Sequence, residues 1–454
     1  MKNETSGFDQ APSPRGRRLG EGDMSRDLAS IPQWRRAFVG TPRITRRTTL
    51  AAILAAPFIR PAHAAPMNLE LTSWQTEEPG FSTWWKEVVA AFNDANPNVH
   101  LLMTGIPNKD YQDQLTVRFA SNRPPPLLEL SPDNIGAYAS QGWLMPLDDR
   151  IKGTPIATDW SSLQKQCVWD GKTQGVLLMS YAFMMFYNGA LLDAAGVKVP
   201  TSWDEFLAAV PKLTDRAKGI FGLSAVTTEY PTISADFLRN IIWSGASLLK
   251  GDKYNLTDPN VIAAMERYRS CVGANAPLGQ NSTVIRQLFV DGKTGFLVDG
   301  PWVYTLLGKA TPQVRPHLQM VKAPFSPPIG GAGNSIHIAA DVDRPTADAA
   351  WSFILFLAQP QWQQRYTELG NVAAPRRDVI TPEIAKQRPE LVQINDAVVG
   401  AINIAPDNQM LQSNYNEFNH IIVESAVKVI STTAPIAQIM KETQDQLERA
   451  VPLS

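Results

Sequence analysis

Cysteine and histidine are both scarce in this chain of 454 residues, which holds two cysteines and five histidines. The histidines are scattered, without the short spacings that bind zinc, so the sequence predicts no metal site. An oxidising compartment would allow Cys167 and Cys271 to form a disulfide, but two separate buried thiols fit the sequence equally well.

The sequence also lacks the common motifs of nucleotide-binding and hydrolytic enzymes. Gly-Lys-Thr at 171–173 and at 292–294 lacks the earlier glycine of a phosphate-binding loop, and the segment 330–335 lacks the third glycine of a dinucleotide fingerprint. No Gly-x-Ser-x-Gly nucleophile motif occurs. We therefore predict a binding protein without a cofactor. A secreted carbohydrate-active hydrolase or lyase is the alternative, because the spacing of catalytic carboxylates is set in space and not in sequence.

Long hydrophobic runs are missing except at residues 48–59, which follow Arg46-Arg47 and precede Ala62-His63-Ala64. Twelve residues interrupted by a proline are too few to span a bilayer. Paired arginines, a weakly apolar segment and small residues before Ala65 are typical of a twin-arginine export signal. We therefore expect residues 1–64 to be a leader and signal peptide, and the mature protein to be periplasmic.

An excess of positive charge is absent as well. The expected leader contains eleven of the 42 Lys and Arg residues and five of the 43 Asp and Glu residues, which leaves 31 basic and 38 acidic residues and a formal charge of −7. This balance argues against nucleic acid and against an anionic membrane surface as partners.

Tryptophan is plentiful, with eleven of the twelve residues in the mature part of the chain. An indole offers a flat apolar surface to the C–H face of a sugar ring, and Asp, Asn, Gln and Arg pair with its hydroxyls. The composition therefore suits a sugar site, although most tryptophans are expected in the core.

Hydrophobic periodicity indicates a βαβ unit at the start of the mature chain. Residues 67–74 alternate as a strand, an apolar helical face from Trp85 to Phe92 follows, and Val99, Leu101 and Met103 alternate as a second strand. Such a unit builds a parallel sheet.

The pattern repeats with a helix spaced by Tyr111, Leu115 and Phe119 and a buried strand at 127–130. Ligands of open α/β sheets bind at the carboxyl ends of strands, which singles out Trp74-Gln75 and Asp133-Asn134. Asp133 fits equally well as the N-cap of a helix before Ile135.

Two later segments have clear signatures. The apolar stretch 174–188 is too long for one ordinary strand and is expected to link two lobes. Ser202 followed by Glu205 is a capping box that opens a helix over 206–213, so Trp203 is expected to pack rather than to bind.

Four motifs occur in order along the chain. They are Trp-Asp-Gly-Lys at 169–172, Phe-Tyr-Asn-Gly at 186–189, Pro-Thr-Ser-Trp-Asp-Glu-Phe at 200–206 and the segment 289–302 ending in Gly-Pro-Trp. Together they resemble the sequences of family 1 extracellular solute-binding proteins. The late helix beginning Ala349-Ala350-Trp351 is similar as well, so the resemblance covers essentially the whole mature chain.

The resemblance implies a two-lobed α/β fold, the type II periplasmic binding protein fold, with ligand trapped between the lobes by hinge closure. It places lobe 1 at 65–186 and 326–370, and lobe 2 at 187–325 and 371–454. Crossings are expected near 184–189, 322–329 and 368–375. The implied partners are a sugar or polyol and the permease of an ABC importer, with no cofactor, and the protein is expected to be monomeric.

The resemblance and the strand-end argument together give the candidate ligand-binding residues. They are Trp74, Gln75, Tyr111, Asp133, Asn134, Ser180, Tyr181, Trp243, Gly300, Trp302, Gly331 (in an expected loop at 330–334), Asn334 and Arg376.

The ligand is expected to be neutral. Members of the resembling family that bind a phosphate ligand carry an arginine in the region after Asn403, whereas the segment 405–414 has no Arg or Lys here. An anion favours a fixed cation, so a neutral sugar or polyol is preferred over glycerol phosphate or another small anion. Arg376 or Arg377 could replace the missing cation.

Overall fold

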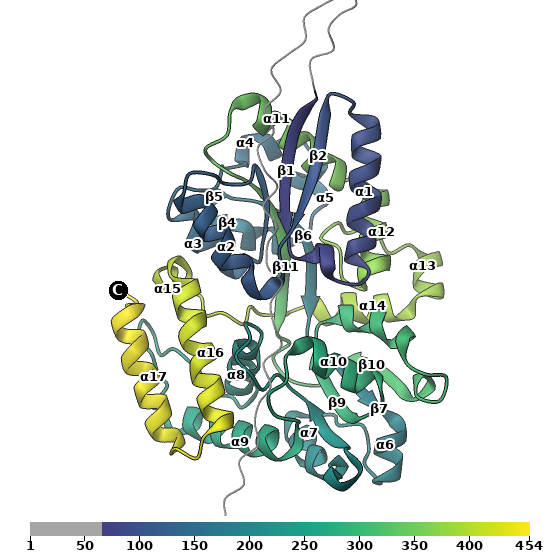
Figure 1. Ribbon diagram of the computed structural model, residues 1–454, viewed down its shortest axis with the longest axis vertical. Coiled ribbons are helices and arrows are strands. Elements are labelled where there is room, and N and C mark those ends of the chain that lie inside the picture. Colours follow the sequence, from purple (N-terminus) through teal and green to yellow (C-terminus); the bar gives the residue numbers. More distant parts are fainter. Residues whose placement is uncertain (1–65) are drawn as a thin grey trace, which may run out of the picture. The chain divides into compact units, whose positions relative to one another are not determined.

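The computed structural model describes residues 66–454, and the expected leader and export signal at 1–64 lie outside this range. Figure 1 shows the helices and strands, which include a five-stranded and a four-stranded sheet. Within residues 66–454 no helix is both long and apolar enough to cross a membrane.

The first sheet has the strand order β2-β1-β3-β11-β6. Its strands are β1 (Met67–Ser73), β2 (Val99–Gly105), β3 (Leu127–Leu130), β6 (Val176–Ala182) and β11 (Gly330–Ile338). Strand β1 is parallel to β2 and β3, and β11 is antiparallel to β3 and β6. The carboxyl ends of β1, β3 and β6 and the amino end of β11 therefore meet at one edge.

The two helices that connect these first strands follow the predicted periodicity. Helix α1 (Phe81–Ala95) buries Trp85, Val88 and Phe92, and it lies along β1 and β2 in Figure 1. Helix α2 (Asn108–Ala120) buries Tyr111, Leu115 and Phe119. The predicted βαβ unit is confirmed, because apolar residues at helical spacing must face the sheet to leave water.

The second sheet has the order β10-β7-β9-β8. Its strands are β7 (Met184–Asn188), β8 (Phe221–Ser224), β9 (Thr294–Asp299) and β10 (Leu318–Lys322). The chain changes sheet at Phe183, between β6 and β7, and returns through residues 323–329 to β11. The stretch 174–188 is thus two strands in two sheets, as its length predicted.

Helices surround each sheet and complete a separate hydrophobic core. The first core contains Leu71, Phe92, Leu128 and Phe353, and the second contains Phe186, Phe206, Phe237 and Ile422. The helices beside the first sheet are α3 (Pro132–Ala139), α4 (Asp148–Ile151), α5 (Pro155–Asp159), α11 (Arg344–Leu357) and α12 (Pro360–Gly370).

The remaining helices add to the second core or lie near it. They are α6 (Gly189–Ala194), α7 (Trp203–Ala209), α8 (Ile233–Trp243), α9 (Pro259–Asn275), α10 (Ser282–Val290), α13 (Pro382–Gln387), α14 (Pro389–Val398), α15 (Gln409–Ser413), α16 (Tyr415–Ser431) and α17 (Ile436–Ala450). Helix α16 packs on α8, α9 and α17, and Figure 1 shows α16 and α17 side by side.

Helix starts were predicted with mixed success. Ser202 caps α7 by accepting a hydrogen bond from the Glu205 backbone N–H, as predicted. Of the two roles open to Asp133, the N-cap is excluded, because Ser131 occupies that position and Pro132 begins α3. Proline has no N–H to satisfy and a fixed φ, which suits the first helical position.

The segment 330–334 was predicted as a loop and is the start of strand β11 instead. Gly330 and Gly331 have φ values of 153° and 110°, and a Cβ on Gly330 would lie 2.1 Å from the Tyr181 carbonyl oxygen. Only glycine allows this approach, after which the register shifts between Ala332 and Ser335 as a bulge.

The two cysteines are separate buried thiols, with Cys167 in the first core and Cys271 in the second. Burial raises the pKa of both thiols to about 12. Of the two alternatives left open by the sequence, the structure has the one without a disulfide.

Candidate functional site

A pocket of about 860 Å³ lies between elements of the two sheets, and we call it the intersheet pocket. From the first sheet's side it is lined by α3 and the segment 165–169, and from the second sheet's side by α8, the turn after it, the segment 401–407 and α15. Its polar and aromatic lining residues are Asp133, Lys165, Gln166, Trp169, Ser247, Asn403, Asp407 and Gln412.

Asp133 lies in the first turn of α3, just beyond the carboxyl end of β3. Among the residues described by the structure, its carboxylate has no ion-pair or hydrogen-bond partner, and burial raises its pKa to about 6. Burial raises the pKa values of the neighbouring Tyr181 and Tyr415 hydroxyls, and the negative charge of Asp133 adds to the rise. Asp133 is half-buried in this structure, so its carboxylate is open to a ligand, and a ligand hydroxyl that donates to it would keep the carboxylate paired once the pocket excludes water.

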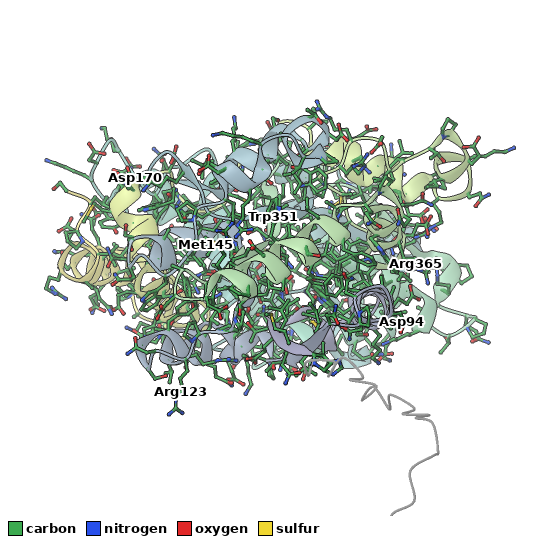
Figure 2. The ribbon with its side chains drawn as sticks, turned by 90° about the horizontal axis from the view of Figure 1, so that it is seen from above. Asp94, Arg123, Met145, Asp170, Trp351 and Arg365 are labelled. Carbon is green, nitrogen blue, oxygen red and sulfur yellow. The ribbon has the colours of Figure 1, made fainter. Side chains whose placement is uncertain are left out.

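Trp169 is presented by the hairpin of β4 (Val168–Trp169) and β5 (Lys172–Thr173). The turn residues Asp170 and Gly171 have φ values of 46° and 70°, as a type I′ turn requires. Figure 2 labels Asp170, which lies at the periphery of that view. The indole lies against α3, where a Cβ on Gly136 would come within 2.8 Å of it. Glycine at 136 therefore allows the half-buried ring to approach α3 beside the pocket.

We expect Trp169→Ala to weaken binding of a sugar in this pocket by about 0.5–1.5 kcal/mol, because the aromatic surface against the ring's C–H face is lost. Isothermal titration calorimetry of the folded variant measures the effect. Trp351→Ala is the matched control: Trp351 lies on α11, is labelled in Figure 2 and lines a separate groove. Unchanged affinity in the Trp169 variant would contradict its role.

Amide groups from three segments meet beside Gly331. A Cβ on Gly331 would lie 3.0 Å from Asn403 Oδ1 and 3.1 Å from Gln166 Oε1, so the absence of a side chain keeps this space open. Gln166 Oε1 also accepts a hydrogen bond of 2.9 Å from the Ala332 backbone N–H. These groups offer donors and acceptors suited to hydroxyls.

The pocket carries little positive charge. Its lining contains one cation, Lys165, and two carboxylates, Asp133 and Asp407, which gives a formal charge of −1. Such a lining favours an uncharged ligand over an anion.

Tyr181 and Trp302 lie where the two cores meet. Their ring centroids are 5.3 Å apart, and both rings pack against the first and the second core. A Cβ on Gly300 would lie 2.1 Å from the Trp302 ring, so glycine lets the indole fold back over the backbone. The structure thus brings Trp302, Gly300, Tyr181, Asp133 and Gly331 together around the passage between the sheets.

Several other predicted residues are buried within the first core and point their polar atoms into it. The Tyr111 hydroxyl donates to the Glu129 carbonyl oxygen (2.8 Å) and packs near Trp74, with ring centroids 4.9 Å apart. Gln75 Oε1 accepts from the Tyr366 hydroxyl at 2.9 Å. Asn334 Nδ2 donates to Glu129 Oε1. Contact of these residues with ligand stays a prediction.

The side chain of Ser180 lacks a hydrogen-bond partner among the described residues, whereas that of Asn134 has one. Ser180 Oγ is buried and has no hydrogen-bond partner within residues 66–454. Asn134 Nδ2 donates to Asn416 Oδ1 of α16 at 2.8 Å, which links α3 to the second core.

Trp243 and Arg376, like every other predicted ligand-binding residue except Asp133, lie outside the lining of the intersheet pocket. Trp243 packs against Trp203 and Phe325 in the second core and donates from Nε1 to the Pro327 carbonyl oxygen at 3.0 Å. Arg376 Nη2 lies 3.2 Å from Asp159 and 3.1 Å from Asp378, so its charge is already paired. Arg376 is therefore poorly placed to replace the missing cation.

Sequence reasoning missed Trp169, Gln166 and Asn403 as pocket residues. The Asp-Gly turn after Trp169 is a sequence signal of a hairpin, and the region after Asn403 corresponds to a ligand-binding segment in the resembling family. Neither signal tells which side chains face the pocket, because that depends on how distant segments pack.

Comparison with known proteins agrees with this architecture. A maltose-bound protein of Thermotoga maritima superposes with a TM-score of 0.75, at 18% identity over 84% of this chain and 99% of that one. Two further structures reach 0.73 over 85% of this chain and 98% of theirs: a ribitol-bound solute-binding protein of Agrobacterium radiobacter, 20% identical, and a Mycobacterium tuberculosis protein with glycerophosphocholine, 19% identical. The predicted two-lobed periplasmic binding protein fold is confirmed.

Sequence relatives point the same way. A Brucella abortus protein proposed to be a binding protein is 26% identical over 63% of this chain and 71% of its own length. The melibiose/raffinose/stachyose-binding protein of Bacillus subtilis is 22% identical over 68% of this chain and 75% of its own length. The model of the bacterial extracellular solute-binding proteins matches residues 75–364, well over half of the sequence, and the chain therefore belongs to this family.

Proposed function

We propose that this protein captures a neutral sugar or polyol in the intersheet pocket and delivers it unchanged to the permease of an ATP-driven importer. The observation that carries the proposal is the pairing of Trp169 with the unpartnered carboxylate of Asp133 in one pocket. An indole face and a hydroxyl acceptor are the two contacts that a sugar ring needs.

The size of the pocket supports a ligand of at least one sugar ring. Its volume of about 860 Å³ lies in the upper part of the range of roughly 300–1,000 Å³ for small-molecule sites. The chain passes between the sheets at Phe183 and at residues 323–329, and these passages are the proposed hinge. Ligand would favour the closed state because only that state surrounds it.

A phosphate-bearing ligand is the second candidate, because the glycerophosphocholine-bound structure has a similar fold. The formal charge of −1 in the pocket argues against it, as does the pairing of Arg376 with Asp159 and Asp378.

Export by the twin-arginine route and a monomeric state also belong to the proposal.

The proposal can be tested by adding maltotriose, raffinose, ribitol or glycerol 3-phosphate to the purified mature protein. We expect a neutral compound to raise the melting temperature and to be recovered intact by mass spectrometry. Turnover of the compound would contradict the binding role, and stabilisation by glycerol 3-phosphate alone would contradict the neutral ligand.

A further inference from the structure

Glu129 has a fully buried carboxyl group and is the next-to-last residue of β3, close to the edge where the strand ends meet. Within residues 66–454, no Lys, Arg or His forms an ion pair with it. A buried carboxylate without a cation is costly unless hydrogen bonds replace its hydration. Its surroundings must therefore provide donors or keep it protonated.

Two side-chain donors converge on this carboxylate from the carboxyl edge of the sheet. The Ser73 hydroxyl donates to Oε2, and Asn334 Nδ2 donates to Oε1 at 2.5 Å. Ser73 Oγ in turn accepts from the Gln75 backbone N–H at 3.0 Å. The ionised carboxylate accepts the bonds from Ser73 and Asn334, whereas the protonated carboxyl group has one oxygen that must donate.

Asn334 connects this cluster to the intersheet pocket. It lies in the bulge of β11, where the register shifts on both sides of it. Two residues earlier, the Ala332 backbone N–H holds Gln166 Oε1, and Gln166 lines the pocket. A bulge is a locally adjustable part of a strand, so its shape depends on the side chain that anchors it.

We infer that Glu129 is a positioning residue: its ionised carboxylate anchors Asn334 and the β11 bulge, which holds Gln166 in place, and protonation weakens this anchor. Ligand affinity then rises as Glu129 loses its proton. The inference rests on the proposed function in its last step only, from Gln166 to the ligand.

The titratable groups that face Glu129 are Glu78, whose own pKa is raised by burial, Tyr111, Tyr366 and His337. Burial is the main reason that the pKa of Glu129 is raised to about 8; the hydrogen bonds from Ser73 and Asn334 oppose the rise and the charge of Glu78 adds to it. Tyr111 on α2 and Tyr366 on α12 face it with pKa values raised well above the usual range, so both stay neutral. His337 on β11 has a pKa lowered to about 4 and contacts Gln174 and Ser335 instead.

A test without ligand measures the melting temperature and hydrogen exchange of the wild type and of Glu129→Gln between pH 6.5 and 9. The glutamine side chain has the shape of the protonated carboxyl group. Because the folded protein holds the Glu129 proton more tightly than the unfolded chain, the melting temperature of the wild type should fall as pH rises from 6.5 to about 8 and level off above that, and this fall should exceed any fall in Glu129→Gln. Hydrogen exchange of the segment 329–336, corrected for intrinsic rates, should slow at pH 9 in the wild type only. Equal pH profiles in both proteins would overturn the inference.

The second arm measures affinity by calorimetry for raffinose or whichever panel compound binds. We expect the wild type to bind about tenfold more tightly at pH 9 than at pH 6.5, because this factor corresponds to the free energy of about one hydrogen bond. The affinities of Glu129→Gln and Asn334→Ala should not change in this way. Glu70→Gln is the control, since Glu70 pairs with Arg118 and should keep the change.

The two arms separate the possible failures. A pH-independent wild-type affinity would overturn the role of Glu129 in the site. If no compound binds, the proposed function fails, while the exchange and melting profiles still decide whether Glu129 anchors the bulge. A purely structural role would lower the stability of Glu129→Gln at every pH without removing a pH-dependent step.

Discussion

Replacing Asp133 with alanine should weaken binding of the neutral ligand by about 1–3 kcal/mol, roughly tenfold to a hundredfold in the dissociation constant. The carboxylate lines the intersheet pocket and has no partner within residues 66–454. A ligand hydroxyl that donates to it gains a charge-assisted hydrogen bond, which is stronger than a bond between neutral groups. Without the carboxylate, that hydroxyl stays buried and unpaired in the complex.

Calorimetry on three variants separates this contact from general electrostatics. Asp133→Asn keeps an acceptor but removes the charge, so its loss should be smaller than that of Asp133→Ala. Asp113→Ala is the matched control, because Asp113 carries the same charge but is exposed on α2 and does not line the intersheet pocket. Equal affinity in folded Asp133→Ala and wild type would reject the assignment of Asp133.

The pH dependence of binding gives a further check on Asp133. Its pKa is raised to about 6 by burial, so its ionised form is lost as pH falls through this value. Ligand hydroxyls pair with the ionised form, and binding should therefore weaken below about pH 6. Asp133→Asn should not show this step.

The sequence was sufficient for elements that depend on local patterns. Helices α1 and α2 and the strands β1, β2 and β3 lie where apolar periodicity places them, because burying one face requires that spacing in any context. Asp133 was singled out by the same local reasoning, as a polar residue directly after a buried strand, and the structure places it in the pocket lining.

Residues whose surroundings come from distant segments could not be predicted in this way. Trp169 reaches the pocket because its hairpin packs on Gly136, thirty-three positions earlier. Tyr111 follows the helical pattern whether its hydroxyl meets a ligand or the backbone, and the structure gives it the Glu129 backbone. The segment 330–334 was predicted as a loop because its glycines hide its pairing with β6.

The buried ion pair between Arg286 and Asp299 supports the second lobe directly below Gly300 and Trp302. Arg286 Nε donates to Asp299 Oδ2 at 2.8 Å and Nη2 donates to Oδ1 at 3.1 Å. Asp299 Oδ1 also accepts from the Gly300 backbone N–H at 2.7 Å, which fixes the turn that carries Trp302. The side chains are only 18% and 12% exposed, so water screens the pair weakly.

Asp299→Ala should lower the free energy of unfolding by about 3–5 kcal/mol, because it leaves the Arg286 guanidinium buried without its bidentate partner. Glu87→Ala is the matched control. Glu87 forms the same bidentate pair with Arg365, labelled in Figure 2, but both side chains are about 40% exposed, and loss of that pair should cost less than about 1 kcal/mol. Urea unfolding of the three proteins measures both values. Similar decreases in the free energy of unfolding of the two variants would show that burial does not determine how much the Arg286–Asp299 pair stabilises the protein.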